Sequence, residues 1–223
     1  MTAEFDSIDV WAFDLDNTLY PADCDLFAQI DVLMGRFISE LLGIEPHEAR
    51  KVQKDFFASH GTTLRGLMDY HHVKPADFLN YVHNVDMSPI PPNARLGRAI
   101  RALPGRKYVF TNADRTYAER VLTRLGIEDV FDGIFDVELA EYHPKPREVA
   151  YDRFLDHFSV DPKRAIMVED MAKNLTPAHL RGMTTAWIPT GSEWSSSGAV
   201  DSHIDHVVDD LTSWVARIAG LAD

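Results

Sequence analysis

The sequence has only one cysteine, Cys24, among its 223 residues. An intrachain disulfide needs two cysteines, so none can form, and a reducing compartment is the natural expectation. The lone thiol could act as a nucleophile, but an isolated cysteine is usually inert. The chain must therefore be held together by packing and hydrogen bonding.

Positive charge is also scarce. Lys and Arg number 22 against 35 Asp and Glu, which gives a formal net charge of -13. Proteins that hold nucleic-acid backbones present clusters of Lys and Arg to the phosphates, and the sequence has no such cluster. We therefore expect no nucleic-acid polymer as a partner. A small anionic substrate remains possible, because a metal ion and a few cations can reverse the field within a site.

Long apolar runs are missing as well. No stretch approaches the ~18 uncharged apolar residues of a membrane-spanning helix. The amino-terminal segment MTAEFDSIDV is acidic and lacks the cationic and apolar regions of a secretory signal. We predict a cytoplasmic protein without a membrane partner, present as a monomer or homodimer.

Strand-like and helix-like patterns alternate along much of the chain. Apolar strand-like runs are Ile8 to Phe13, KYVFTNA, DGIFDVEL, AIMVED and MTTAWIP. Helical patterns such as DRTYAERVLTRLG and REVAYDRFLDHF lie between them. Strands that alternate with helices imply right-handed crossovers and a parallel sheet covered on both faces. The expected fold class is α/β, with a Rossmann-like three-layer core.

A helical insertion is expected after the first strand. Apolar residues recur at three- and four-residue spacing from Asp25 to Leu42, and further helical patterns follow in PHEARKVQKDFFASHG, TTLRGLMDYHH and PADFLNYVHNV. Three prolines in SPIPPNA then break the chain. We predict an all-helical insert over residues 21–95 and a core of residues 1–20 and 96–223. The later segment TGSEWSSSGA is interpreted as a solvated connector.

Polar side chains follow four of the predicted strands. In chain order they are Asp14, Asp16 and Thr18; Thr111 and Asn112; Lys145; and Glu169 with Asp170. Ligands of open α/β sheets bind outside the carboxyl ends of the strands. Because the feature recurs on successive strands, with one lysine among the acids, the sequence indicates a single site.

The acidic residues suit a magnesium-dependent reaction at phosphorus. Asp14 and Asp16 would project to one side about 6–7 Å apart if extended, and with Asp170 they offer the hard oxygen ligands that Mg2+ prefers. Asp14 could then be the nucleophile, its charge screened by the metal and Lys145. Asp16, its pKa raised by its like-charged neighbour, could protonate a departing alkoxide. A phosphoryl group would be bound by Thr18, Thr111, Asn112 and Lys145.

The aspartates allow two other interpretations. The segment DLDNTLYPADCD begins like a calcium-binding EF-hand loop, but Leu19 stands where glycine is required and Asp25 where the bidentate glutamate belongs. The acids could also be a solvated strand end with no function. The presence of Lys145, Glu169 and Asp170 at the other strand ends argues against that interpretation.

These residues resemble the haloacid dehalogenase superfamily of phosphohydrolases. Its first motif, DxDxT after a strand, matches Asp14, Asp16 and Thr18, and its second, Thr or Ser after a strand, matches Thr111. Its lysine matches Lys145 in HPKP, and its acidic pair matches Glu169 and Asp170 in MVEDMAKNL. The resemblance implies that the helical insert, residues 21–95, is a cap domain over the site.

The resemblance also implies a two-step hydrolysis with Mg2+ as cofactor. Asp14 attacks the phosphomonoester while Asp16 protonates the leaving oxygen, and Asp16 then deprotonates the water that hydrolyses the aspartyl-phosphate. The implied Mg2+ ligands are the Asp14 carboxylate, the Asp16 backbone carbonyl and Asp170, with Glu169 acting through water. Asn174 departs from members that carry a further aspartate there. Dehalogenases of the superfamily lack the second aspartate, so Asp16 favours phosphoryl transfer.

Within the superfamily, the chain looks like the pyrimidine 5'-nucleotidase branch. The similar segments are DLDNTLYP, GTTLRGLM, DFLNYVHNVDMSPI and LPGRKYVFTNA. We therefore expect a hydrolase that removes phosphate from nucleoside 5'-monophosphates such as UMP or CMP. Candidate specificity residues in the cap are His60, Thr62, Thr63 and Arg65, for which helix capping and solvent exposure are the alternative. Phe27, Met34 and Phe37 of the first cap helix are expected to be core residues rather than ligand contacts.

Three alternatives to this function remain. The substrate could be another small phosphate ester, such as a sugar phosphate, phosphoglycolate or lysophosphatidate. A phosphomutase would pass the phosphoryl group to a second hydroxyl and release little inorganic phosphate. A non-catalytic binding protein on the same fold is disfavoured, because every residue needed for turnover is present.

Overall fold

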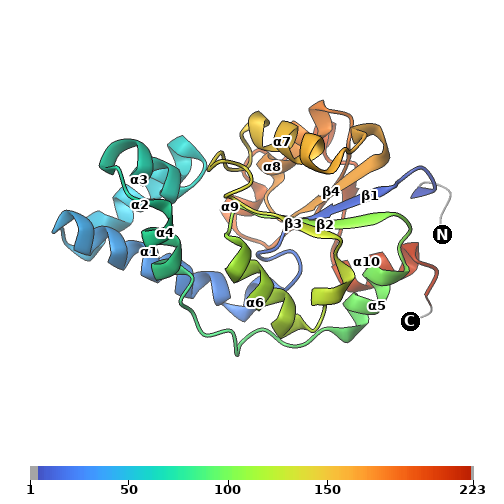
Figure 1. Ribbon diagram of the computed structural model, residues 1–223, viewed down its shortest axis with the longest axis horizontal. Helices are drawn as coiled ribbons and strands as arrows, with labels where there is room; N and C mark the ends of the chain where they lie inside the picture. The colour runs from blue at the N-terminus through green and yellow to red at the C-terminus, as the bar shows by residue number, and fades with distance from the viewer. Residues whose placement is uncertain (1–4, 222–223) are drawn as a thin grey trace.

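A parallel sheet forms the centre of the core in the computed structural model, which describes residues 5–221 (Figure 1). Within that range six strands lie in the order β3-β2-β1-β4-β5-β6, and all neighbours are parallel. The strands are β1 (Val10–Phe13), β2 (Arg106–Phe110), β3 (Gly133–Phe135), β4 (Ala165–Glu169), β5 (Thr184–Trp187) and β6 (His206–Val207). The predicted α/β class is confirmed. The ends of the predicted core, residues 1–4 and 222–223, lie outside the described range.

Helices cover both faces of the sheet (Figure 1). On one face lie α5 (Ala94–Ala102), α6 (Arg115–Leu125) and α10 (Leu211–Ile218), and on the other α7 (Glu148–Phe158) and α8 (Ala172–Leu180). Trp11 and Phe13 of β1 join the first apolar cluster, whereas Val10 and Ala12 join the second. Because successive strand residues point to opposite faces, this short run of β1 contributes to both layers of the core.

The strand order reverses direction at β1. The chain moves from β1 to β2 and β3 on one side, and β4, β5 and β6 then extend the sheet on the other. Phe13 is in register with Val168 of β4, and the Asp14 amide donates to the Val168 carbonyl at 2.8 Å. The carboxyl ends of β1 and β4 therefore flank the crevice where doubly wound sheets bind ligands.

Four helices form a separate lobe inserted after β1, at the left of Figure 1. They are α1 (Leu26–Leu42), α2 (Pro46–His60), α3 (Thr63–His71) and α4 (Pro75–Val82). Gly43 ends α1 in the left-handed conformation, and Glu45 and Glu48 form a reciprocal capping box at the start of α2. The helical insertion is thus confirmed, and we call it the cap. Its limits at residues 21 and 95 stay a prediction.

Some short elements depart from the sequence pattern. Pro177 lies inside α8 rather than in its first turn. A proline there removes the helical hydrogen bond to the carbonyl four residues earlier, that of Lys173. The Tyr151 hydroxyl of α7 donates to the Asn174 carbonyl of α8. TGSEWSSSGA contains the helix α9 (Glu193–Ser196). The 3-10 helices are η2 (Ala22–Cys24), η3 (Glu128–Val130), η4 (Pro162–Arg164) and η5 (Asp201–His203).

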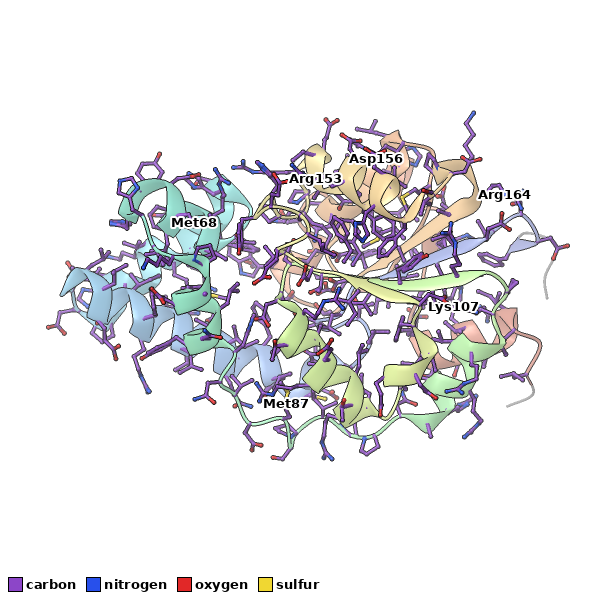
Figure 2. The ribbon with its side chains drawn as sticks, in the orientation of Figure 1. Met68, Met87, Lys107, Arg153, Asp156 and Arg164 are labelled. Carbon is purple, nitrogen blue, oxygen red and sulfur yellow. The ribbon has the colours of Figure 1, made fainter. Side chains whose placement is uncertain are left out.

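Side chains fill the space between the sheet and its two helical layers (Figure 2).

Among the helices of residues 5–221, none combines the length and the apolar character that crossing a membrane requires.

Candidate active site

Lys145 joins two acids at the carboxyl edge of the sheet. Its Nζ donates to Asp14 Oδ1 at 2.7 Å, to Glu169 Oε1 at 2.8 Å and to the Phe110 carbonyl at 2.8 Å. The lysine is 1% exposed, and all three protons of its ammonium group are used. The residue after β1 and residues of β2 and β4 are thereby fixed around one cation from the segment before α7.

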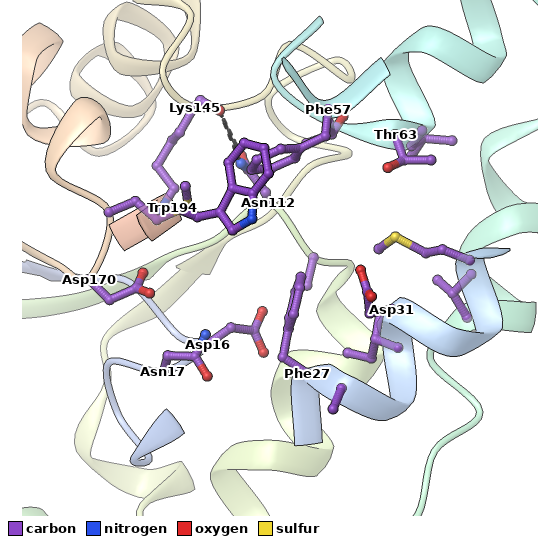
Figure 3. A pocket seen from close by; sticks show the side chains of 18 of the residues that line it. Asp16, Asn17, Phe27, Asp31, Phe57, Thr63, Asn112, Lys145, Asp170 and Trp194 are labelled. Carbon is purple, nitrogen blue, oxygen red and sulfur yellow. Dashed lines mark hydrogen bonds between the residues drawn. The ribbon is translucent and has the colours of Figure 1, made fainter. Parts of the chain in front are cut away.

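Glu169 and Asp170 have different roles although they are adjacent. Glu169 Oε1 also accepts from Asn174 Nδ2 at 2.6 Å, and its Oε2 accepts from the Met171 amide at 2.8 Å. Both oxygens of Glu169 are therefore already bound to protein donors. Asp170 follows β4 and points, on the same side as Asp16, into a cavity that is described below (Figure 3). Asp170 is thus the acid of this pair that is available to a ligand.

The buried acids fit a divalent cation. Asp14, Glu169 and Asp170 are all buried, and one ligand oxygen from each lies within 4.8 Å of the others. Three carboxylates around one Lys145 leave an excess of negative charge that a divalent ion would neutralise. Asp14 and Asp170 would hold the ion, with Glu169 behind them.

Burial changes the proton affinity of these acids. Removal from water, reinforced by the charge of Glu169, raises the pKa of Asp14 to about 7, although Lys145 opposes the change. The pKa of Asp170 is raised for the same reasons, burial first and then Glu169 and Asp14. Cation binding requires the ionised carboxylates, so it must compete with protons.

The contribution of Asp14 to the stability of the metal-free protein should therefore fall as pH rises. Folded Asp14 keeps its proton to a higher pH than unfolded Asp14, so the folded state binds more protons between about pH 4 and 7. We expect the Tm of the wild type to fall relative to that of the Asp14→Asn variant by on the order of 5 °C across this range. Calorimetry with chelator at several pH values measures this difference.

Magnesium should reverse the trend. Because the ion binds ionised acids, it should raise the Tm of the wild type more at pH 8 than at pH 5.5. An equal rise at both pH values would contradict a site built on Asp14 and Asp170.

The predicted phosphate-binding residues are placed differently from one another. Thr18 Oγ1 donates to Asp14 Oδ2 at 3.3 Å, and Thr111 Oγ1 accepts from the amide two residues later at 3.0 Å. Asn112 uses its side chain on the backbone of Lys145: Oδ1 accepts from the amide at 2.8 Å and Nδ2 donates to the carbonyl at 3.1 Å (Figure 3). Asn112 is the one of these three residues that lines the cavity described below, and it also positions Lys145.

Two tyrosines that sequence reasoning missed bind Asp16. The hydroxyls of Tyr20 and Tyr117 donate to Asp16 Oδ1 at 2.6 and 2.7 Å. Burial, reinforced by the charge of Asp16, raises the pKa of both phenols, so both stay protonated donors. Tyr20 is four residues after Asp16, a spacing that could have drawn attention. Tyr117 is 101 residues away, and no local pattern points to it.

A cavity of about 490 Å³ extends from these acids to the cap. Its core end includes the acids Asp14, Asp16, Glu169 and Asp170. Aromatic residues that line it further out include Phe27 of α1, Phe57 of α2 and Trp194 of α9 (Figure 3). Phe57 and Trp194 meet edge to face, with ring centroids 5.3 Å apart, so the cap touches the core across the cavity. At the cap end, Asp31 pairs with Arg50 at 2.8 Å and with Lys54 at 2.6 Å.

Only two of the four predicted cap residues are among the described residues that line this cavity, Thr62 and Thr63. Thr62 caps α3 by accepting from the Arg65 amide at 3.2 Å, as the alternative interpretation held. Arg65 is paired with Asp69 at 2.8 Å, one helical turn away. His60 ends α2 with its Nδ1 2.7 Å from the hydroxyl of the preceding serine.

The interpretation of TGSEWSSSGA as a solvated connector holds only in part: most of its residues are exposed, but the segment also contributes to the cavity. Thr190, Ser192, Trp194 and Ser195 all line the cavity. Ser192 caps α9, and the Ser195 hydroxyl donates to the Asp170 carbonyl, which ties the segment to the site. The Gly and Ser content of this segment predicts a loop, but composition alone does not identify the residues that the loop contacts.

Apolar residues of α1 were also predicted to be core. Phe27 instead lines the cavity and is 38% exposed, whereas Met34 both packs against the core and lines the cavity. Phe37 packs edge to face on Phe78 with ring centroids 5.2 Å apart, as a core residue does. Helical periodicity identifies an apolar face but does not separate packing against a helix from lining a cavity.

Known proteins resemble the chain in sequence and in structure. Residues 8–179 match the family of haloacid dehalogenase-like hydrolases. Phosphate metabolism protein 8 of Saccharomyces cerevisiae is 28% identical over 137 residues. That match covers 56% of this chain and 42% of the yeast protein, so the chain spans less than half of this curated relative.

Solved structures share the fold over nearly the whole chain. A haloacid dehalogenase phosphatase from Thermococcus onnurineus superposes with a TM-score of 0.65 at 18% identity, covering 96% of this chain and 98% of that one. YfnB from Bacillus subtilis, a putative hydrolase solved bound to magnesium, gives a TM-score of 0.60 at 13% identity, covering 96% and 99%. The match over residues 8–179 takes in all the acids and the lysine described above, and the chain belongs to the haloacid dehalogenase-like hydrolase family.

Proposed function

We propose that the protein is a Mg2+-dependent phosphomonoesterase that hydrolyses nucleoside 5'-monophosphates, with the pyrimidine nucleotides UMP and CMP preferred. One observation carries the proposal: Asp14 is held by Lys145 at the end of a cavity that Asp16 and Asp170 also line. A nucleophile, a proton-transfer group and a cation site thus face the same space. The family and the metal-compatible acids support a hydrolase of this kind.

The reaction follows from the placement of two carboxylates. Asp14 attacks phosphorus, the bond from phosphorus to the ester oxygen breaks, and Asp16 gives its proton to that oxygen. Asp16 then takes a proton from water, whose oxygen displaces the Asp14 carboxylate from phosphorus and releases phosphate. Lys145 stays positively charged and paired with Asp14 throughout. A bound Mg2+ would supply charge neutralisation for the phosphoryl oxygens.

The outer part of the cavity supports a nucleoside as the leaving group. The aromatic residues Phe27, Phe57 and Trp194 offer faces and edges on which a planar base could stack. Asp31, Arg50 and Lys54 place donors and acceptors at the cap end, where the carbonyl and amine edge of a pyrimidine could bind. The volume is within the range of small-molecule sites.

Lysophosphatidate is a second candidate, because apolar side chains also line the cap end. They include Ile30, Met34, Leu64, Phe78, Leu79 and Val82. An acyl chain could pack on this surface, whereas a sugar phosphate has no apolar group to place there.

A panel of phosphate esters tests the proposal. With Mg2+, we expect kcat/KM for UMP and CMP to exceed that for sugar phosphates, phosphoglycolate and lysophosphatidate by at least about tenfold, or about 1.4 kcal/mol. Chelator should abolish turnover of all of them. Initial rates of phosphate release measure both effects, and equal turnover of unrelated esters would remove the nucleotide assignment.

Trp194→Ala tests the stacking role directly. We expect KM for UMP to rise about tenfold, because stacking on an aromatic ring is worth roughly 1–3 kcal/mol per base, with glycerol phosphate little affected. Leu180→Ala is the matched control, since Leu180 is an apolar residue 69% exposed on α8 that does not line the cavity.

A further inference from the structure

One oxygen of Asp16 is bound by two buried phenols, and the other is not. Tyr20 and Tyr117 are each 1% exposed, and their hydroxyls, which both donate to Oδ1, lie 3.4 Å apart. Among the described residues, none donates a hydrogen bond to Oδ2 of Asp16. The carboxylate faces the cavity (Figure 3). Oδ2 is therefore the atom that can exchange a proton with a ligand.

Both chain segments that connect the cap to the core contribute to this arrangement. Tyr20 lies on the outgoing segment, between β1 and α1, and His83 begins the returning segment, directly after α4. The ring of His83 stacks on Tyr117, with centroids 4.3 Å apart and planes at 23°. His83 Nδ1 also pairs with the carboxylate of Asp114, which caps α6 by accepting from the Tyr117 amide at 2.9 Å.

The returning segment is bound along α6 of the core. Arg120 donates to the carbonyls of His83 at 2.7 Å and Val85 at 2.9 Å. Arg124 donates to the carbonyl of Met87 at 3.2 Å, where the segment passes below α6 in Figure 2. The His83 ring is thus held against Tyr117 by a series of contacts to one core helix.

We propose that Tyr20 and Tyr117 are positioning residues, which fix Oδ1 of Asp16 so that Oδ2 faces the leaving oxygen, and that the His83 ring holds Tyr117 in place. The inference rests on the proposed function, because it needs Asp16 to transfer a proton to the leaving group. As the bond from phosphorus to the ester oxygen breaks, that oxygen keeps the electron pair and takes the proton from Oδ2. The resulting carboxylate keeps its two phenol hydrogen bonds.

Tyr20→Phe and Tyr117→Phe test the proposal with two leaving groups. Glycerol phosphate releases an alkoxide that needs a proton, whereas 4-nitrophenyl phosphate releases a stable phenolate. Misplacing a reacting group by about 1 Å can cost about 100-fold, so we expect kcat for the alkyl ester to fall about 10- to 100-fold. For the aryl ester we expect a fall of less than about 3-fold, with KM unchanged for both.

Two variants provide references. Asp16→Asn should show the same preference for the aryl ester in a stronger form. Tyr81→Phe is the matched control, because the Tyr81 hydroxyl also donates to a carboxylate, Glu40 at 3.0 Å, but on the cap surface away from the cavity. It should leave both rates unchanged.

Substitution of His83 tests the stacking contact. His83→Ala removes the ring and should reproduce the selective loss with the alkyl ester, whereas His83→Phe keeps a ring against Tyr117 and should restore most of the rate. Equal losses with Ala and Phe would show that the ring stack does not support Tyr117.

The outcomes separate this inference from the proposed function. Equal losses with both esters, or no loss in either tyrosine variant, would overturn the positioning role while leaving a phosphatase. If the wild type hydrolysed no phosphate ester, the proposed function would fail. The crystal structure of Tyr117→Phe would then decide the positioning claim: a displaced Asp16 carboxylate supports it, and an unmoved one overturns it.

Discussion

Replacing Asp14 by Asn should lower kcat for every phosphate ester by at least about 1,000-fold. The amide has nearly the same shape but cannot form the bond to phosphorus. Lys145 keeps its other partners, Glu169 and the Phe110 carbonyl, so the site should stay assembled. Initial rates with UMP and with 4-nitrophenyl phosphate under saturating Mg2+ measure the effect.

The loss should not come from unfolding. In the absence of metal, burial and Glu169 raise the pKa of Asp14, so its charge destabilises the fold at neutral pH. The Asn variant should therefore be at least as stable as the wild type in urea at pH 8. Asp129→Asn, at an exposed residue paired with Arg101, is the control and should keep full activity. Turnover by Asp14→Asn within tenfold of the wild type would exclude Asp14 as nucleophile.

Replacing Lys145 by Met should lower the free energy of unfolding by about 3–5 kcal/mol, because breaking a buried ion pair leaves charge without a partner. Met fills a similar volume but supplies no donor to Asp14 Oδ1, Glu169 Oε1 or the Phe110 carbonyl. The side chain of Lys145 is 1% exposed, so water cannot replace these hydrogen bonds. Urea denaturation at pH 7 with chelator measures the loss.

Two comparisons isolate the cause. Arg101→Met removes the cation of the exposed pair with Asp129, whose side chains are 59% and 66% exposed, and should change stability by less than about 1 kcal/mol. Adding Glu169→Gln to Lys145→Met removes one uncompensated charge and should recover part of the stability. If Lys145→Met were no worse than Arg101→Met, the lysine would not hold the acids together.

The core and its acidic edge could be predicted from local patterns. VWAF and AIMVE are short apolar runs, and the residues that follow such strands must meet at one edge of a parallel sheet. Asp14, Glu169 and Asp170 are brought together for this reason, and Lys145 reaches Asp14 and Glu169 from the segment before α7. The helical insertion could be predicted as well, because Gly43 is a stop signal after α1 and Pro46 is a start signal in the first turn of α2.

The contacts between distant side chains could not be predicted. Tyr117 reaches Asp16 only because α6 follows the neighbouring strand, and no spacing in the sequence encodes that contact. Asp31, Arg50 and Trp194 line the cavity because the cap lies over the sheet edge, which depends on how the two lobes pack. His60 and Arg65 look like a polar cluster in sequence, but the helix directs Arg65 toward Asp69.

The place of β1 between β2 and β4 has a consequence for how the protein is made. Both neighbours of β1 are synthesised later, β2 from residue 106 and β4 from residue 165. On the ribosome, β1 therefore emerges with two open edges, while the cap helices can form locally as they emerge. Asp14 leaves the exit tunnel long before Lys145, and the buried ion pairs can form only after Glu169 has emerged as well.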